Sequence, residues 1–274
     1  MPRIPIEDTF TDVIAKAQRG LGISDKELCA LAEVSPEDLR AVKSGQLLDA
    51  VIRRVARHLR LGPNALEELA HKRWYPEAPV FPHGFAIFNA PYEDITVNSY
   101  LVWDARARAA AAFDTGPDAG DMLGLVRSEG LKLQMVFITH AHDDHVADLE
   151  RIVRETGAEV WASEREARGL TGARVFRENA HFHIGGIAIK TLATWGHSPG
   201  QTSFYVTGLS YPLAVVGDAL FASSIGGSAT HFADQHRNDV EKILTLPRNT
   251  VLACGHGPLT TVAQEKRHNP FFAP

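Results

Sequence analysis

Three histidines and two aspartates lie within six positions of the chain, from His140 to His145. Imidazole nitrogens and carboxylate oxygens are the ligands that zinc and similar divalent ions bind in proteins. In an extended or tightly turned segment, residues two apart point the same way, so His140 and His142 can converge on one ion. Asp144 and His145 fall on the neighbouring side, where they can serve a second ion. The run therefore predicts metal chemistry.

An apolar stretch precedes this run. Val136, Phe137 and Ile138 have the composition of a buried strand, so the histidines follow directly where that strand ends. A polar loop that happens to be rich in histidine is the alternative interpretation. We favour metal ligation, because so many polar groups beside a buried strand need a partner that offsets their loss of water.

The spacing His-X-His-X-Asp-His after a strand resembles the signature of the metallo-β-lactamase superfamily. The resemblance covers roughly residues 78–274 and implies an α+β fold, an αββα sandwich that holds one or two metal ions at one edge. It also implies three later ligands, each behind an apolar run: His197, Asp218 and His256. The segment Ala112-Phe113-Asp114-Thr115-Gly116 matches the place where the family carries an aspartate behind the ligands.

The resemblance implies which of these residues bind each ion. His140, His142 and His197 would hold one ion, and Asp144, His145 and His256 the other. Asp218 would bridge the two ions, together with a hydroxide. Two such ions lower the pKa of a bound water and stabilise the oxyanion formed when that water attacks a carbonyl. Asp144 is the expected catalytic residue, orienting the hydroxide or moving its proton. Asp114 would fix one ligand histidine through its outer N–H. Zinc is the favoured metal, with iron or manganese as alternatives.

The end of the chain, from Gly255 to Thr261 and on to Phe271, resembles the short glyoxalase II-like hydrolases. This implies hydrolysis of a small thioester or ester, as in hydroxyacylglutathione hydrolases. Similar thioesterases usually carry Arg near Gly227 and Asp near Ala229, and this chain has neither, so the acyl group and the recognition of glutathione stay open. A lactonase and a mononuclear iron sulfur dioxygenase on the same fold are the alternatives.

The N-terminal part of the sequence, residues 1–74, carries helix signals only. Ser24 with Glu27 forms a capping box, and Ser35 with Pro36 starts another helix. This pattern resembles the phage-repressor type of helix-turn-helix domain and implies that the helix from Pro36 would enter the DNA major groove. Glu37 and Asp38 at its start would repel phosphate. We therefore favour dimerisation or coverage of the catalytic site over DNA binding, and a DNA-binding regulator stays as an alternative.

We expect a linker at residues 75–80, where prolines recur, and a catalytic domain over residues 81–274. The 274-residue chain has a net charge of −5, which argues against a general affinity for nucleic acid or membrane surfaces. No run approaches the ~20 apolar residues of a membrane span, and no apolar secretion segment opens the chain. With only Cys29 and Cys254, a disulfide is not expected. These features predict a cytoplasmic protein, and a homodimer is compatible with them.

Overall fold

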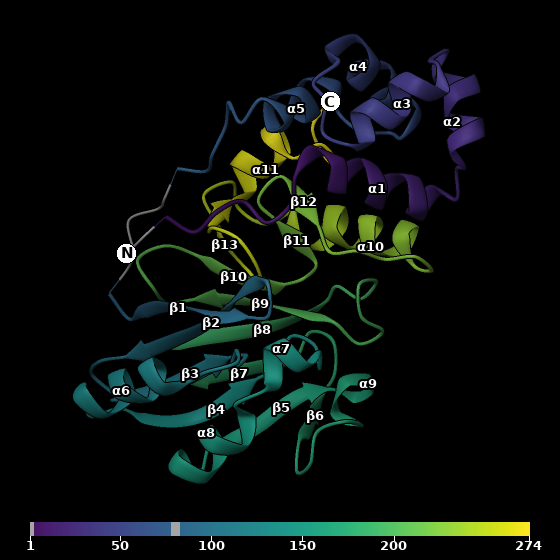
Figure 1. Ribbon diagram of the computed structural model, residues 1–274. Helices are drawn as coiled ribbons and strands as arrows, with labels where there is room; N and C mark the ends of the chain where they lie inside the picture. Colours follow the sequence, from purple (N-terminus) through teal and green to yellow (C-terminus); the bar gives the residue numbers. More distant parts are fainter. Residues whose placement is uncertain (1–2, 78–82) are drawn as a thin grey trace.

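The computed structural model describes residues 3–77 and 83–274. Two six-stranded sheets stack face to face, with helices on both outer faces and a separate group of helices at one end (Figure 1). This arrangement confirms the predicted α+β sandwich preceded by helices.

The first sheet has its strands in sequence order. The β1–β2 and β2–β3 pairs are antiparallel, and the pairs from β3 to β6 are parallel. Parallel neighbours need a crossover, which α6 (Gly120–Ser128) supplies between β3 and β4, and α7 (Asp143–Val146) with α8 (Leu149–Thr156) between β4 and β5. The strands are β1 (Phe85–Tyr92), β2 (Ile95–Asp104), β3 (Ala109–Phe113), β4 (Lys132–Phe137), β5 (Glu159–Ser163) and β6 (Arg174–Phe176).

The second sheet runs in the order β14-β13-β10-β9-β8-β7, and β10 and β13 at its middle are parallel. A two-stranded hairpin, β11 with β12, follows β10. The strands are β7 (His181–Ile184), β8 (Ile187–Ala193), β9 (Thr202–Thr207), β10 (Leu213–Gly217), β11 (Leu220–Phe221), β12 (Ser224–Ile225), β13 (Val251–Cys254) and β14 (Thr260–Thr261).

Apolar side chains fill the space between the sheets. Phe113, Phe137 and Phe204 are fully buried there and contact one another through their rings. The outer face of the first sheet packs on α6 and α8, and that of the second packs on α11 and the turn after α10. The helices of this part are α6 (Gly120–Ser128), α7 (Asp143–Val146), α8 (Leu149–Thr156), α9 (Glu164–Ala167), α10 (Phe232–Asn238), the π-helical turn Asp239–Ile243, and α11 (Val262–His268).

The regular elements that the structure describes within residues 3–74 are all helices, as predicted. Ser24 and Glu27 form the expected capping box, and Thr9 with Asp12 forms another. The helices are α1 (Phe10–Leu21), α2 (Asp25–Ala32), α3 (Pro36–Lys43), α4 (Asp49–His58) and α5 (Pro63–Ala70). Their core also takes in Ile225 and Phe271 from the sandwich part of the chain. The helix-turn-helix character and the division into domains stay predictions.

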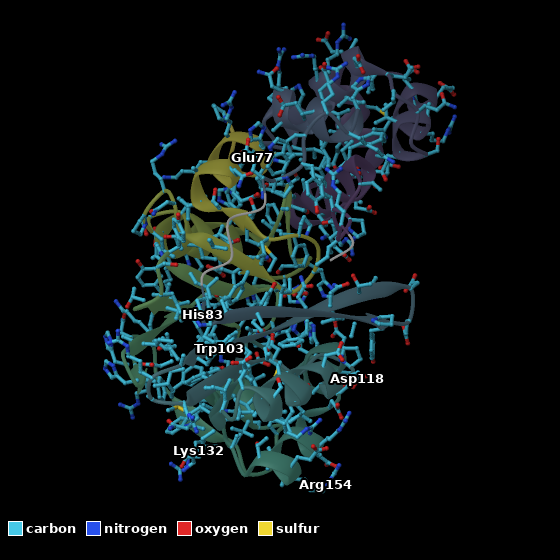
Figure 2. All side chains as sticks on the ribbon, turned by 90° about the vertical axis from the view of Figure 1, so that its left-hand side faces the viewer. Glu77, His83, Trp103, Asp118, Lys132 and Arg154 are labelled. Carbon is cyan, nitrogen blue, oxygen red and sulfur yellow. The ribbon has the colours of Figure 1, made fainter. Side chains whose placement is uncertain are left out.

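The described part of the predicted linker lies against both regions. The Tyr75 hydroxyl donates to the Ile4 carbonyl (2.6 Å), and the Glu77 N–H donates to Gln264 Oε1 on α11 (2.7 Å). Glu77, which therefore lies next to α11, is labelled in Figure 2. Residues 78–80 of that linker, and residues 81–82 at the start of the predicted catalytic domain, lie outside the described residues. Among the described helices, none combines the length and the apolar character needed to cross a bilayer.

Candidate metal centre

All seven predicted ligands follow strand ends at one edge of the sandwich. His140, His142, Asp144 and His145 come after β4, and His197 comes after β8. Asp218 directly follows β10, and His256 follows the parallel neighbour β13. Because parallel strands end at the same edge of a sheet, these last two ligands are carried to the same place.

The first predicted triad is assembled. Nδ1 of His142 lies 3.1 Å from Nε2 of His140 and 3.2 Å from Nε2 of His197. His140 is fully buried, whereas His142 is exposed. The triad therefore has a solvent-facing side over His142.

The second triad is assembled beside it. Oδ2 of Asp144 lies 3.4 Å from Nε2 of His256 and 3.6 Å from Nε2 of His145. His145 and His256 are both buried. Each of the two triads brings its ligand atoms within 4.8 Å of one another, as a shared ion requires.

Asp218 lies between the triads. Its Oδ1 is 3.3 Å from Nε2 of His145, and its Oδ2 is 3.4 Å from Nε2 of His256 and 3.5 Å from Nε2 of His197. One carboxylate thus faces histidines of both triads. A side chain on Gly255 would collide with Asp218 Oδ1, so this close approach needs glycine.

The donor set fits divalent ions. Four ligands around one zinc at 2.0–2.1 Å are about 3.3 Å apart, close to the spacings within both triads. His145 Nε2 and Asp218 Oδ1 are buried, form no hydrogen bond and face each other at 3.3 Å. Buried polar atoms are normally satisfied, and an ion bound by both would satisfy them. That the seven residues bind metal stays a prediction.

The outer nitrogens of four histidines are held by other groups, which turns the inner nitrogen towards the site. His140 Nδ1 contacts Thr139 Oγ1 (3.0 Å), and His145 Nδ1 contacts Asp114 Oδ2 (2.8 Å). His197 Nδ1 contacts the Gly227 carbonyl (2.9 Å), and His256 Nδ1 contacts the Thr96 carbonyl (2.9 Å).

Asp114 occupies the position behind the ligands that the sequence predicted. Besides His145, it accepts hydrogen bonds from the N–H (2.8 Å) and the hydroxyl (2.7 Å) of Thr139. Its φ of 55° lies in the left-handed region, which aspartate tolerates better than most residues. Asp114 therefore connects ligands of both triads, His145 directly and His140 through Thr139.

The electrostatics of the cluster follow from burial and charge. Burial lowers the pKa of His145, but the Asp218 and Asp114 carboxylates outweigh it and raise that pKa to about 10. The same competition, with Asp218 and Asp144, raises the pKa of His256 to about 11. His140 behaves oppositely, because burial and the neighbouring His145 hold its pKa well below the ordinary value. The carboxylates thus attract positive charge to the centre of the site.

Glu166 on α9 is a supporting residue that the sequence did not indicate. Its Oε2 accepts from the Ala141 N–H (2.9 Å), and its Oε1 accepts from the Ser198 hydroxyl (2.5 Å) and the Gly200 N–H (2.7 Å). One buried carboxylate thereby fastens the loop of His140 and His142 to the loop of His197.

Asn98 and Tyr100, on β2, hold the strand and loop that carry His256. The Asn98 amide donates to the carbonyls of Cys254 (3.0 Å) and Gly257 (2.8 Å), and the Tyr100 hydroxyl donates to the Cys254 carbonyl (2.5 Å). Their place on an early strand predicts a structural role, and their contacts agree with one.

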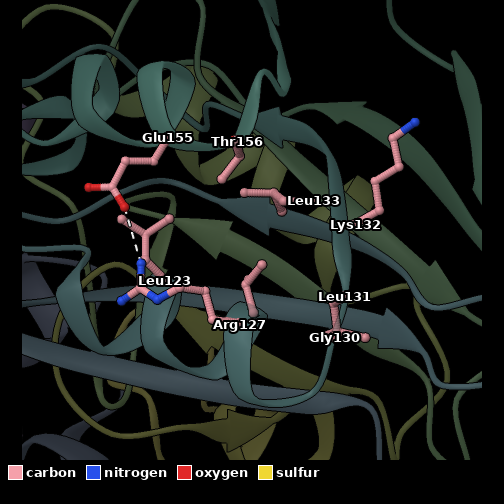
Figure 3. A pocket seen from close by; sticks show the side chains of 9 residues that line it. Leu123, Arg127, Gly130, Leu131, Lys132, Leu133, Glu155 and Thr156 are labelled. Atoms are coloured by element: carbon pink, nitrogen blue, oxygen red, sulfur yellow. Dashed lines mark hydrogen bonds and ion pairs between the residues drawn. The ribbon is translucent and has the colours of Figure 1, made fainter.

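A surface pocket of about 470 Å³ lies between α6, α8 and the start of β4, where Arg127 and Glu155 form an ion pair at 3.1 Å (Figure 3). It is at the opposite end of β4 from His140. This pocket therefore takes no part in the metal centre.

Comparison with known proteins gives the family. The profile described as the metallo-beta-lactamase superfamily matches residues 92–256, more than half of the chain. The chain belongs to this superfamily. The match confirms the resemblance inferred from the His140–His145 run, and it begins after the helical region.

Two curated relatives are similar to parts of the chain. Hydroxyacylglutathione hydrolase of Pseudomonas entomophila (strain L48) is 31% identical over 160 residues, which are 57% of this chain and 60% of that protein. Hydroxyacylglutathione hydrolase GloC of Haemophilus influenzae is 29% identical over 203 residues, which are 64% of this chain and 92% of that protein. Among solved structures, TTHA1623 in a di-iron-bound form has a TM-score of 0.53 and 26% identity, covering 67% of this chain and 99% of that one.

Proposed function

We propose that this protein is a metal-dependent hydrolase that uses two divalent ions to cleave a small thioester or ester. The observation that carries the proposal is the pair of ligand triads on either side of Asp218. The names of the two curated relatives support thioester hydrolysis, and the di-iron-bound form of TTHA1623 supports a pair of ions.

Divalent ions bound there supply a water of lowered pKa as the nucleophile and positive charge for the oxyanion. The side chains supply position and proton transfer. Asp144 is half-buried, 3.4–3.6 Å from the inner nitrogens of His256 and His145, so its carboxylate can orient the attacking water and accept its proton. Asp114 and Glu166 hold the loops that carry the predicted ligands in place before substrate binds.

The substrate carbonyl would approach from the side of His142, since His140, His145 and His256 are buried. A cysteine nucleophile is not required. Cys254 is buried in β13, where burial raises the pKa of its thiol well above the ordinary value and keeps it neutral. Both cysteines are free, in keeping with the cytoplasmic location that we propose.

The identity and number of the ions separate the alternatives. Imidazole and carboxylate ligands suit zinc, iron and manganese, and we propose zinc first. Elemental analysis of protein loaded with each metal is expected to give two ions per chain. A single iron per chain, with oxygen-dependent oxidation of a persulfide, would instead favour the sulfur dioxygenase. Hydrolysis of lactones faster than of thioesters would favour the lactonase.

The direct test uses ligand variants. We expect His142→Ala and Asp218→Ala each to lose metal and thioester hydrolysis. The matched control is Arg40→Ala, because Arg40 is exposed on α3 and pairs only with Glu37 among the described residues. Arg40→Ala should hydrolyse thioesters at the wild-type rate. Turnover that persists after complete removal of metal would overturn the proposal.

A further inference from the structure

Helix α10 lies next to the β11–β12 hairpin (Figure 1), and its fully buried side chain Gln235 is bonded to the backbone at both ends of that hairpin. The Gln235 amide nitrogen donates to the Ala219 carbonyl (3.2 Å) and to the Gly226 carbonyl (2.9 Å). Ala219 directly follows the predicted ligand Asp218. Both N–H groups of the amide are therefore used to close the loop that begins at this ligand.

Gly226 lies between two of the predicted ligands. A side chain on Gly226 would lie 2.0 Å from the Asp218 carbonyl oxygen and 2.9 Å from His197 Nδ1. The next residue, Gly227, provides the carbonyl that His197 Nδ1 contacts at 2.9 Å. Because Gln235 holds the Gly226 carbonyl, it also restrains the neighbouring acceptor that orients the His197 ring.

The same helix holds the chain that leads into His197. Gly196 packs so closely on α10 that a side chain there would lie 2.3 Å from Gln235 Cβ. One turn further along α10, the Asn238 amide donates to the Trp195 carbonyl at 2.7 Å. Helix α10 therefore holds the loop before His197 and the loop after Asp218 in a fixed relation to each other.

The other end of the Gln235 amide faces an unusual neighbour. Oε1 of Gln235 is buried and accepts no hydrogen bond from the residues that the structure describes. Asp239 lies four residues on, its N–H bonded to the Gln235 carbonyl, so the two side chains are neighbours on one face of the helix. Asp239 is fully buried too, and within residues 3–77 and 83–274 neither of its carboxyl oxygens meets a donor.

Burial without a partner favours the neutral form of Asp239. An ionised carboxylate is very costly to remove from water unless a cation or several donors compensate it. The basic side chains closest to Asp239 along the chain, Arg237 and Lys242, each pair with another carboxylate. Burial accordingly raises the pKa of Asp239 well above its ordinary value. A neutral carboxyl group has one O–H to donate, and Gln235 Oε1 is a buried acceptor one turn away.

We propose that Gln235 is a positioning residue for the metal centre, and that Asp239 is a neutral acid whose O–H donates to Gln235 Oε1 and fixes the orientation of its amide. The amide then presents both of its N–H groups to the loop after Asp218. The proposal rests on the proposed two-ion hydrolase. It adds a pair of residues that touch neither the ions nor the substrate and that act through His197 and Asp218.

The role of the acid can be separated from its charge and its size. Asp239→Asn keeps a donor, because the amide N–H takes the place of the acid O–H. Asp239→Leu keeps a similar size and removes the donor, so the Gln235 amide loses the group that fixes its orientation. A buried acid without a role would give the opposite order, since exchanging an unpartnered polar group for an apolar one of similar shape is neutral or favourable.

The first measurement is a competitive zinc titration of the metal-free full chain against a chelator of known affinity, with the unfolding temperature recorded for each variant. Gln235→Met removes both N–H groups and should weaken zinc binding about 10- to 100-fold. Asp239→Asn should bind zinc like wild type, and Asp239→Leu should bind it more weakly. The double variant with Gln235→Met and Asp239→Leu should bind no more weakly than Gln235→Met alone, because Asp239 acts through Gln235. Glu241→Gln is the matched control, since Glu241 is exposed in the same π-helical turn as Asp239 and should leave zinc affinity unchanged.

Two magnetic resonance measurements report on position rather than on stability. In zinc-loaded wild type, the His197 Nδ1 proton should be protected from exchange by the Gly227 carbonyl, and it should exchange faster in Gln235→Met. In protein labelled with carbon-13 aspartate, the Asp239 signal is the one missing from Asp239→Asn. Its carboxyl carbon should have the chemical shift of a neutral acid at neutral pH.

An ionised Asp239 at neutral pH, or an Asp239→Asn variant that binds zinc as weakly as Asp239→Leu, would overturn the role of Asp239. Additive losses in the double variant would overturn the bond between the two side chains. Wild-type zinc affinity and His197 exchange in Gln235→Met would overturn the role of Gln235. These three outcomes leave the hydrolase standing, whereas wild-type protein that binds no zinc and hydrolyses no thioester would overturn both. If Asp239→Leu or Gln235→Met does not fold, the carboxyl shift and the zinc affinity of Asp239→Asn still decide the role of the acid.

Discussion

Glu166→Gln isolates the contribution of a residue that touches no metal ligand side chain yet joins two ligand loops. The substitution keeps the size of the side chain and removes its charge. Glu166 now accepts three hydrogen bonds, from the Ala141 N–H, the Ser198 hydroxyl and the Gly200 N–H. Glutamine has only one acceptor oxygen, so its NH₂ group must face at least one of these donors.

The magnitude can be worked from those three bonds. If the amide nitrogen takes the place of Oε2, only the hydrogen bond from the Ala141 N–H is lost. If it takes the place of Oε1, the two bonds from Ser198 and Gly200 are lost, so the first placement costs less. A buried donor left unsatisfied costs about 1–3 kcal/mol. If this loss makes the loops about 2 kcal/mol harder to order when metal binds, the dissociation constant for the metal rises about 30-fold. Substitutions behind metal ligands typically cost 10- to 100-fold in affinity, so the value is in the usual range.

The assay is a competitive titration of the metal-free protein with zinc against a chelator of known affinity, with chemical unfolding measured in parallel. Glu164→Gln is the control on the same helix. Glu164 is 78% exposed, and its ion pair with Arg168 is long, at 3.8 Å. That variant should match wild type in both measurements. A Glu166→Gln protein that unfolds more easily but binds zinc with wild-type affinity would refute the idea that Glu166 organises the site.

Two further predictions concern charge at the centre. Zinc binding at pH 7.5 should release about two protons, because His145 and His256 have pKa values raised to about 10 and about 11 and must lose their protons to ligate. The affinity for zinc should therefore rise with pH, steeply up to about 10 and less steeply up to about 11. Calorimetry in buffers of different ionisation enthalpy counts the protons, and a release near zero would contradict the assignment. Asp114→Asn should weaken metal binding about 10- to 100-fold, because asparagine loses one of the acceptor oxygens shared by Thr139 and His145. Unchanged affinity in the same chelator titration would remove Asp114 from the supporting structure.

The sequence was informative wherever local pattern decides structure. The run from His140 to His145 behind a buried strand indicated the family, and the capping box at Ser24 marked a helix start that the structure confirms. After His142 the chain forms two short helices, α7 and α8, and between them the Asp148 carboxylate accepts the Ala119 N–H at 2.8 Å.

The remaining parts of the site depend on packing between distant segments. Glu166 lies in a run of charged residues, and nothing in that run separates it from the exposed Glu164. Burial and tertiary contact give Glu166 its role.

The core shared by the five N-terminal helices with Ile225 and Phe271 has a consequence for how the protein comes apart. Detaching those helices would uncover apolar side chains on the hairpin after Asp218 and on the C-terminal stretch, so we expect each portion to be less stable alone than in the whole chain. Heat or denaturant should then unfold both portions in one cooperative step, and loss of the ions should lower the stability of α1 as well.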